Sequence, residues 1–143
     1  MPYRFLDDIA IADVAFEARG KSREEMFAAA ADALMNVMVA ELETIRPVEE
    51  VAFRLENRAL DMLLFNFLGE FIFCKDARLL LLRPHSLTII PESGRYNLHA
   101  VTRGERLDPA RHPLTVDVKA VTLHRFQVEE TKDGWRSVVV LDI

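Results

Sequence analysis

The first forty residues combine one alternating segment with one segment of helical periodicity. Residues 14–18 alternate between apolar and polar or small side chains, which predicts a half-buried strand that ends at Gly20. The Ser-Arg-Glu-Glu sequence at residues 22–25 matches a capping box, in which the serine and the last glutamate satisfy free backbone N–H groups at a helix start. Apolar residues at helical spacing follow, so we expect a helix that runs to about Val39.

A second strand and a second helix follow Pro47. Residues 51–55 alternate again, and Asn57 is a candidate cap for a helix that extends to about Cys74. This helix is apolar around most of its circumference. Such a helix is normally buried against a sheet on one side and against another element on the other.

The rest of the chain has the short apolar and alternating runs that are typical of strands. Glu92-Ser93-Gly94 and Asp133-Gly134 are hairpin turn signals, and the polar stretch 102–113 predicts a loop. The predicted strands are residues 79–82, 87–90, 96–101, 116–119, 121–129 and 135–143.

The order strand, helix, strand, helix and then several strands predicts an α+β fold. We expect two layers, in which two main helices pack on one face of a largely antiparallel sheet. The sequence contains no internal repeat and no linker, so residues 1–143 are predicted to form a single domain.

The charge and composition of the chain limit which binding partners and which cellular compartment we expect. The net charge is -5, which weighs against tight non-specific binding of nucleic acid, because such binding requires many cations. Cys74 is the single cysteine and is expected to pack as a small hydrophobic residue in a reducing, cytoplasmic setting. Asp7 and Asp8 stand where a signal peptide would need an apolar stretch, and no segment is apolar for long enough to span a bilayer.

Candidate chemistry is sparse when judged from residue types alone. The four histidines are scattered, and His124 is expected to be a hydrogen-bonded structural residue. Asp108 and Arg111 lie in the predicted loop, where the default is a solvated side chain, and Lys119 is expected to face water. No phosphate loop, HExxH motif or nucleophile elbow is present in the sequence.

Two aspartates and the last residue form the one candidate site. Asp13 begins the first long strand, Asp142 is the penultimate residue, and Ile143 supplies backbone oxygens. If these strands are neighbours, the oxygens could converge into the kind of site that Ca²⁺, Mg²⁺ or Mn²⁺ prefers. The alternative is that Asp13 caps a loop and Asp142 is a solvated chain end.

Three stretches of the sequence resemble the archease family. Residues 11–38 resemble a T-A-D-V strand followed by a G-K-[ST]-x-E-E helix start, and residues 60–73 resemble an L-L-x-x-[WF]-L-x-E-x-[IL] helix. The most specific motifs are at the end of the chain, where residues 111–126 and 133–143 resemble H-x-L-x-x-x-V-K-A-[VI]-T-x-H and G-W-x-x-x-V-x-L-D-[IV]. The chain departs from the family at Ala10 and Ile11, where many members have His-Thr, so a possible ligand or hydrogen-bond partner near Asp13 is missing.

The resemblance implies both a site and a role. It implies a divalent-metal site at Asp13, Asp142 and Ile143, and an accessory role for an RtcB-type RNA ligase in tRNA splicing and RNA repair. In that role the protein promotes guanylylation of the ligase by GTP and multiple turnover. It is expected not to be an enzyme itself, to reach RNA through the ligase and to bind no DNA. Two alternatives stay open, a chaperone-like module that binds protein or RNA and a metal-dependent hydrolase.

Overall fold

The computed structural model describes residues 2–6 and 13–143 of the chain. A five-stranded sheet has the order β1-β2-β8-β6, with β7 also paired to β8, and a three-stranded sheet has the order β3-β5-β4; every pairing is antiparallel. The elements are β1 (Tyr3–Leu6), β2 (Asp13–Gly20), α1 (Arg23–Met38), a 3-10 turn (Leu42–Thr44), β3 (Glu49–Asn57), α2 (Leu60–Arg78), β4 (Leu80–Glu92), β5 (Arg95–Arg106), β6 (Ala120–Val121), β7 (Gln127–Thr131) and β8 (Gly134–Asp142).

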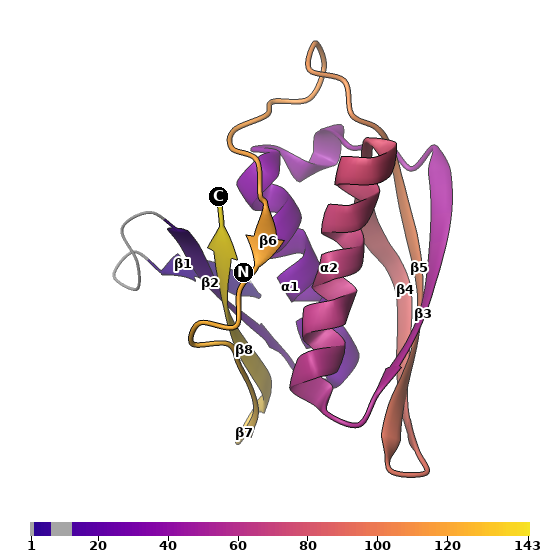
Figure 1. The fold of residues 1–143 in the computed structure, drawn as a ribbon, viewed down its shortest axis with the longest axis vertical. Helices are drawn as coiled ribbons and strands as arrows, with labels where there is room; N and C mark the ends of the chain where they lie inside the picture. The colour runs from indigo at the N-terminus through magenta and orange to yellow at the C-terminus, as the bar shows by residue number, and fades with distance from the viewer. Residues whose placement is uncertain (1, 7–12) are drawn as a thin grey trace.

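The two helices lie between the two sheets (Figure 1). Helix α1 contacts β2 of one sheet and β4 of the other, and α2 contacts β3 and β4 on one side and β6 on the other. The predicted α+β class with antiparallel pairing is confirmed. The strands form two sheets, each with helices on one face, because helices with broad apolar surfaces need cover on both sides. This arrangement matches the burial that the sequence of the second helix predicts.

The capping box at the start of α1 forms with one change of partner. The Ser22 hydroxyl accepts from the Glu25 N–H at 3.1 Å, whereas the Glu25 carboxylate accepts from the N–H of Lys21, at 2.8 Å, and not from the cap itself. Gly20 permits this tight entry, since a Cβ there would lie 2.3 Å from the backbone nitrogen of Met26. The helix ends at Met38 and Val39 is its C-cap, as predicted.

Helix α2 begins later and ends later than the sequence suggests. Asn57 is not its cap: its side-chain oxygen accepts from the N–H of Ala59, at 2.9 Å, within the turn that precedes the helix. Ala59 occupies the N-cap position without a side-chain hydrogen bond. The helix continues one turn beyond Cys74 to Arg78, and Leu79 ends it with a left-handed conformation (φ 54°).

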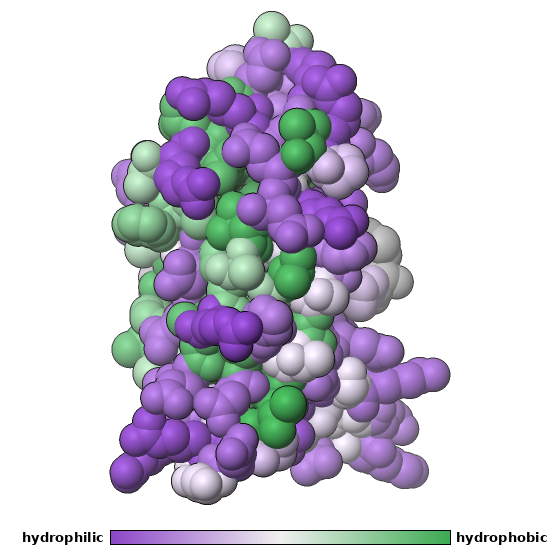
Figure 2. All heavy atoms as spheres, turned by 90° about the vertical axis from the view of Figure 1, so that its right-hand side faces the viewer, coloured by the Kyte–Doolittle hydropathy of each residue, from purple (hydrophilic) through white to green (hydrophobic). Residues whose placement is uncertain are grey.

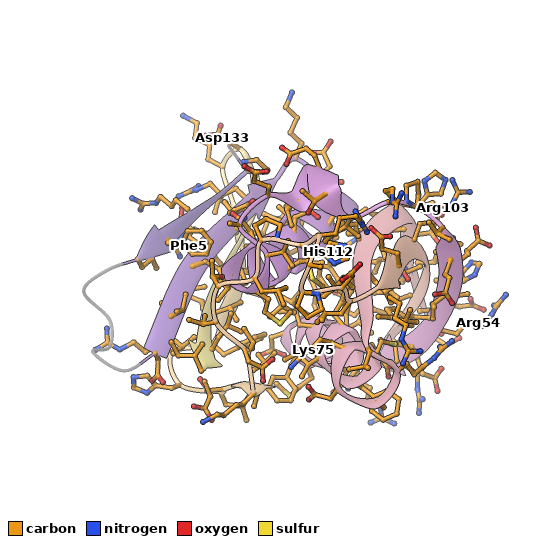
Figure 3. All side chains as sticks on the ribbon, turned by 90° about the horizontal axis from the view of Figure 1, so that it is seen from above. Phe5, Arg54, Lys75, Arg103, His112 and Asp133 are labelled. Atoms are coloured by element: carbon orange, nitrogen blue, oxygen red, sulfur yellow. The ribbon has the colours of Figure 1, made fainter. Side chains whose placement is uncertain are left out.

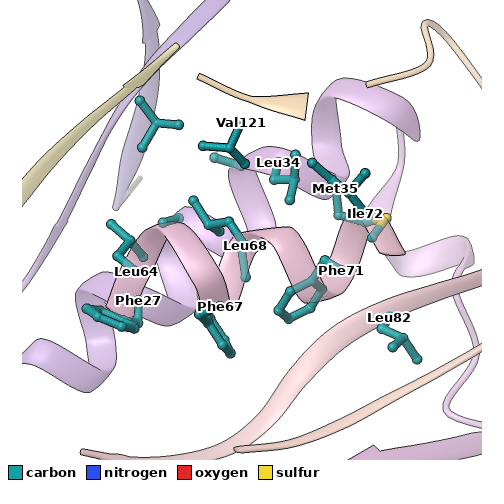
Figure 4. Packing of buried hydrophobic residues seen from close by; sticks show 14 of the residues in the cluster. Phe27, Leu34, Met35, Leu64, Phe67, Leu68, Phe71, Ile72, Leu82 and Val121 are labelled. Atoms are coloured by element: carbon teal, nitrogen blue, oxygen red, sulfur yellow. The ribbon is translucent and has the colours of Figure 1, made fainter. Parts of the chain in front are cut away.

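Aromatic side chains fill the space between the helices and the three-stranded sheet (Figure 4). The Phe67 and Phe71 rings of α2 pack edge to face with their centroids 5.0 Å apart. Phe53 of β3 contacts both rings, and Phe27 of α1 contacts Phe67. Cys74 is 4% exposed and packs in this core as expected.

The second half of the chain differs most from the predicted elements. Strand β4 is continuous through an irregularity between Pro84 and Ser86, and β5 extends to Arg106, into the predicted loop. Residues 116–119 form no strand, and the predicted strand 121–129 divides into the short strands β6 and β7. The predicted final hairpin is present as β7–β8, with Thr131 opposite Gly134.

The face of the molecule on the side of β3 is largely polar (Figure 2). Figure 2, which views the molecule from the side of β3, shows a mostly hydrophilic face with scattered hydrophobic side chains. Among the residues described, none of the helices has the length and apolar content to cross a bilayer.

Candidate metal centre

The pairing of β2 with β8 brings the predicted site residues together. Asp13 lies directly opposite Asp142 in the antiparallel register, and Ile143 follows at the end of the same strand. Directly opposed residues project to the same face, with Cβ atoms about 5 Å apart. Here that face is the outer one, because the alternate residues Phe16 and Leu141 belong to the core beneath the helices.

Strand β6 fixes the other side of Asp142. Ala120 pairs with Asp142, and the Lys119 N–H donates to the Asp142 carbonyl oxygen at 2.8 Å. Both the N–H and the hydroxyl of Thr122 donate to the carbonyl of Val140, at 3.0 and 2.9 Å. The backbone around Asp142 is therefore held from both sides, whereas its side chain is exposed.

The two carboxylates have no cationic partner within residues 2–6 and 13–143. Asp13 is half-buried, Asp142 is exposed, and neither side chain forms an ion pair there. Like charges at directly opposed positions repel each other. A divalent cation between them would remove this repulsion.

The donor set fits a cation that keeps part of its water shell. The described residues contain no group of three or more histidine, cysteine or acidic side chains suited to hold a metal, so this pair offers two carboxylates plus backbone oxygens such as those of Ile143. Mg²⁺ and Mn²⁺ accept one or two carboxylates, with water or phosphate oxygens completing the shell, whereas Ca²⁺ usually takes six to eight oxygens. Ala10 and Ile11, where the sequence departs from the family, lie outside the described residues.

A second polar cluster, centred on Glu105, fixes the position of the segment 107–119 between β5 and β6. Glu105 is 6% exposed and accepts from the backbone N–H of Arg46 at 2.8 Å and from the side chains of Arg111 and His112. Burial would raise the pKa of the Glu105 carboxyl, but these donors outweigh burial and lower its pKa to about 2. Figure 3 shows His112 near the middle of the molecule when it is viewed from above.

The hydrogen bonds of His112 define its tautomer. Its Nδ1 accepts from the Asp108 N–H at 2.9 Å, so the ring proton is on Nε2, which lies 3.0 Å from the Glu105 carboxylate. Asp108 is exposed as expected, but Arg111 is not a solvated loop residue, because it binds Glu105 and the Thr44 carbonyl. The partners of Arg111 lie in β5 and in the 3-10 turn, and the local polar pattern of the loop does not reveal them.

Lys75 of α2 binds the segment 107–119 at a second point, near its end. Its side chain is 6% exposed and its ammonium group contacts the carboxylates of Asp76 and Asp117 at 2.5 and 2.6 Å and the Val118 carbonyl at 2.9 Å. Burial would lower the pKa of Lys75, but the two carboxylates raise it overall. Residues 117 and 118 directly precede Lys119, so this contact helps to set the position of the strand that pairs with Asp142.

The histidine at the other end of β6 has a different setting from the one predicted. His124 lies in a turn between β6 and β7 and is exposed, so it is not a strand residue. Its backbone N–H donates to the Thr122 hydroxyl at 3.3 Å. Lys119 is exposed, as predicted.

Sequence comparison matches nearly the whole chain to one family. The family model described as the archease protein family (MTH1598/TM1083) matches residues 3–143. The protein archease of Methanosarcina barkeri is 33% identical over 142 residues, which cover 99% of this chain and 95% of that protein. The protein archease of Pyrococcus abyssi is 36% identical over 137 residues, which cover 92% and 93%.

Solved structures share the fold. The solution structure of Methanobacterium thermoautotrophicum protein 1598 superposes with a TM-score of 0.85 at 26% identity and covers 99% of both chains. The crystal structure of an archease, described as a possible chaperone, from Thermotoga maritima gives a TM-score of 0.64 at 22% identity, with 94% and 93% covered. The second likeness concerns the fold alone. On the family match and the sequence identities, the chain belongs to the archease family.

Proposed function

We propose that this protein activates an RtcB-type RNA ligase that acts in tRNA splicing and RNA repair. It promotes GTP-dependent guanylylation of the ligase and multiple turnover, it acts in the cytoplasm, and it is not a catalyst on its own. RNA is reached through the ligase. Membership of the archease family supports this role, and the observation that carries the proposed metal site is the direct opposition of Asp13 and Asp142.

In this proposal, three residues hold a Mg²⁺, Mn²⁺ or Ca²⁺ ion at the end of the outer sheet face. Asp13 and Asp142 supply the anionic ligands and Ile143 supplies backbone oxygen. An ion held there would supply positive charge to offset the negative charge of a phosphoryl group during its transfer. The hydrogen bond from Lys119 to the Asp142 carbonyl keeps the last strand in register, so that both carboxylates stay on one face.

The test measures metal binding and ligase activation on the same variants. Asp13→Asn and Asp142→Asn should each weaken Mn²⁺ binding in calorimetric titration by at least about tenfold, because each removes one of two anionic ligands. Both should also reduce the transfer of labelled GMP from GTP to a purified RtcB-type ligase. Asp133→Asn is the matched control, since it removes an exposed carboxylate at the opposite end of β8.

Two outcomes would contradict the proposal at different points. Unchanged Mn²⁺ binding by both variants would reject the site, and a parent protein that fails to stimulate the ligase would reject the role. A chaperone-like module that binds protein or RNA is the alternative function, and the Thermotoga maritima archease is itself described as a possible chaperone. Suppression of aggregation of unrelated proteins, independent of metal and of Asp13, would support that candidate instead.

A further inference from the structure

The outer face of the five-stranded sheet carries a cluster of arginines around one buried carboxylate. Glu17 of β2 is 4% exposed, and its oxygens contact the side chains of Arg19, Arg136 and Arg4 at 2.7, 3.0 and 3.5 Å. Arg136 also contacts Glu129 at 2.9 Å. The register places Glu17 beside Arg4 on β1, and Arg19 beside Arg136 on β8, so these side chains share one face.

Cations outnumber anions in this cluster. Burial would raise the pKa of the Glu17 carboxyl, but the arginines outweigh burial and lower the pKa to about 2, so Glu17 is charged at neutral pH. Arg125, in the turn before β7, is exposed and forms no ion pair within the described part of the chain. Among the described residues of this cluster, four arginines therefore stand against two glutamates, a local excess of two positive charges, whereas the net charge of the chain is -5.

Two hollows border the arginines, with volumes of about 480 and 270 Å³. The larger one combines apolar and cationic side chains beside β7, and the smaller one lies over β1 and β2, where Glu17 is part of its wall. The lining residues are Leu6, Arg125, Phe126, Gln127, Arg136 and Val138 for the larger, and Pro2, Tyr3, Arg4, Glu17 and Arg19 for the smaller. The arginine-bearing surface is therefore recessed at two places, which could receive protruding side chains of a partner.

The spacing of the two outermost arginines indicates an extended partner. Arg4 on β1 and Arg125 beside β7 are separated by the width of three strand spacings, about 15 Å, which is too wide for a single phosphate group. Arginine mixed with aromatic and aliphatic side chains is typical of protein interfaces. The net negative charge of the chain opposes binding along a nucleic-acid backbone.

We propose that this arginine face, defined as Arg4, Arg19, Arg125 and Arg136, docks on an acidic surface of a partner protein. The inference rests on the proposed function in one respect, that the partner is the RNA ligase. Asp13 and Asp142 lie at the other end of the same sheet face, about 20 Å along the strands from Arg19 and Arg136. Docking through the arginines would therefore present the two carboxylates to the same partner.

The experiment measures binding without metal or GTP, so that it does not depend on the carboxylate site. Fluorescently labelled protein is titrated with purified RtcB-type ligase in EDTA, at low and at high salt. Arg125→Asp and Arg4→Glu should each raise the Kd about tenfold, and high salt should weaken binding of the parent. Aspartate is chosen at residue 125 because it tolerates the positive φ of 53° there.

Arg54→Glu is the matched control. Arg54 is exposed on the outer face of the other sheet, where it points away from the helices in Figure 3, and its reversal should change the Kd by less than about twofold. Because Arg4 contacts Glu17, the melting transition of Arg4→Glu is measured as well; Arg125→Asp removes no ion pair among the described residues.

Each remaining outcome overturns a distinct statement. If the parent binds and both arginine variants bind equally well, the docking face is rejected while the ligase role stands. If the parent does not bind the ligase, the docking proposal and the proposed function both fall. If the two variants lose affinity for tRNA alone but not for the ligase, the face binds nucleic acid and the proposal is overturned.

Discussion

Carboxylates occupy two contrasting environments in this molecule. Glu17 and Glu105 are each almost fully buried and each contacts arginine side chains, whereas Asp13 and Asp142 lie opposite each other without a cation among the described residues. The first kind stabilises the fold because its charge is compensated within the chain. The charges of Asp13 and Asp142 are not compensated among the described residues, so they are available to a bound cation. The contrast separates structural carboxylates from candidate ligands without reference to the family.

The largest expected effect is on acid stability. The pKa of Glu17 and that of Glu105 are each lowered from 4.5 to about 2, so both groups bind protons more weakly in the folded state than in the unfolded state. Their contribution, about 3 kcal/mol each, is complete above about pH 5 and is lost as the pH falls from about 4.5 to 2. The two contributions together approach the whole free energy of unfolding of a small domain. We therefore expect the protein to unfold cooperatively in that pH window, and circular dichroism measures this transition.

The control for this prediction is a variant that cannot titrate. Glu105→Gln should show a smaller further loss of stability as the pH falls through the same window than the parent does. A parent whose free energy of unfolding is flat across this range would show that these carboxylates are not compensated as the structure indicates.

The second largest expected effect is the loss of stability that Glu105→Gln causes at neutral pH. The substitution leaves Arg111, His112 and the Arg46 N–H facing an amide, and loss of one partner from a buried charged network costs about 3 kcal/mol. For a domain of this size the melting temperature should fall by roughly 10 °C. Glu50→Gln, which breaks one exposed pair with Arg103, should cost less than about 1 kcal/mol. Equal effects of the two variants would mean that burial of Glu105 does not matter.

Local patterns in the sequence predict the parts of the fold that depend on nearby residues. The strand before Gly20, the capping box at Ser22 and the final hairpin were all recognisable, since each depends on residues a few positions apart. The four residues of β1 and the two of β6 are too short for any periodicity. The division into two sheets depends on packing between distant parts of the chain. The apolar circumference of the second helix indicated only that the helix is covered on two sides.

The candidate site was predictable only in part and for a similar reason. Asp13 and Asp142 have nothing distinctive as single residues, and their pairing between the two ends of the chain follows from the topology and, at the level of sequence, from the family resemblance. The cluster around Glu105 was missed because its partner Arg46 lies 59 residues away. A polar loop sequence does not distinguish a solvated His112 from a buried one.

The smallest expected effect has the opposite sign and tests the contrast most directly. Asp13→Asn and Asp142→Asn each remove one of two directly opposed like charges, so without metal they should leave the free energy of unfolding unchanged or raise it by about 0.5 kcal/mol. The parent, in contrast, should gain about 2.7 kcal/mol when Mn²⁺ is present at about a hundred times its Kd, and the variants should lose most of that gain. Urea denaturation with EDTA and with Mn²⁺ measures both quantities on the same samples. If either variant is strongly destabilised in EDTA, its carboxylate belongs with Glu17 and Glu105 as a structural group, and the distinction between the two environments fails at that residue.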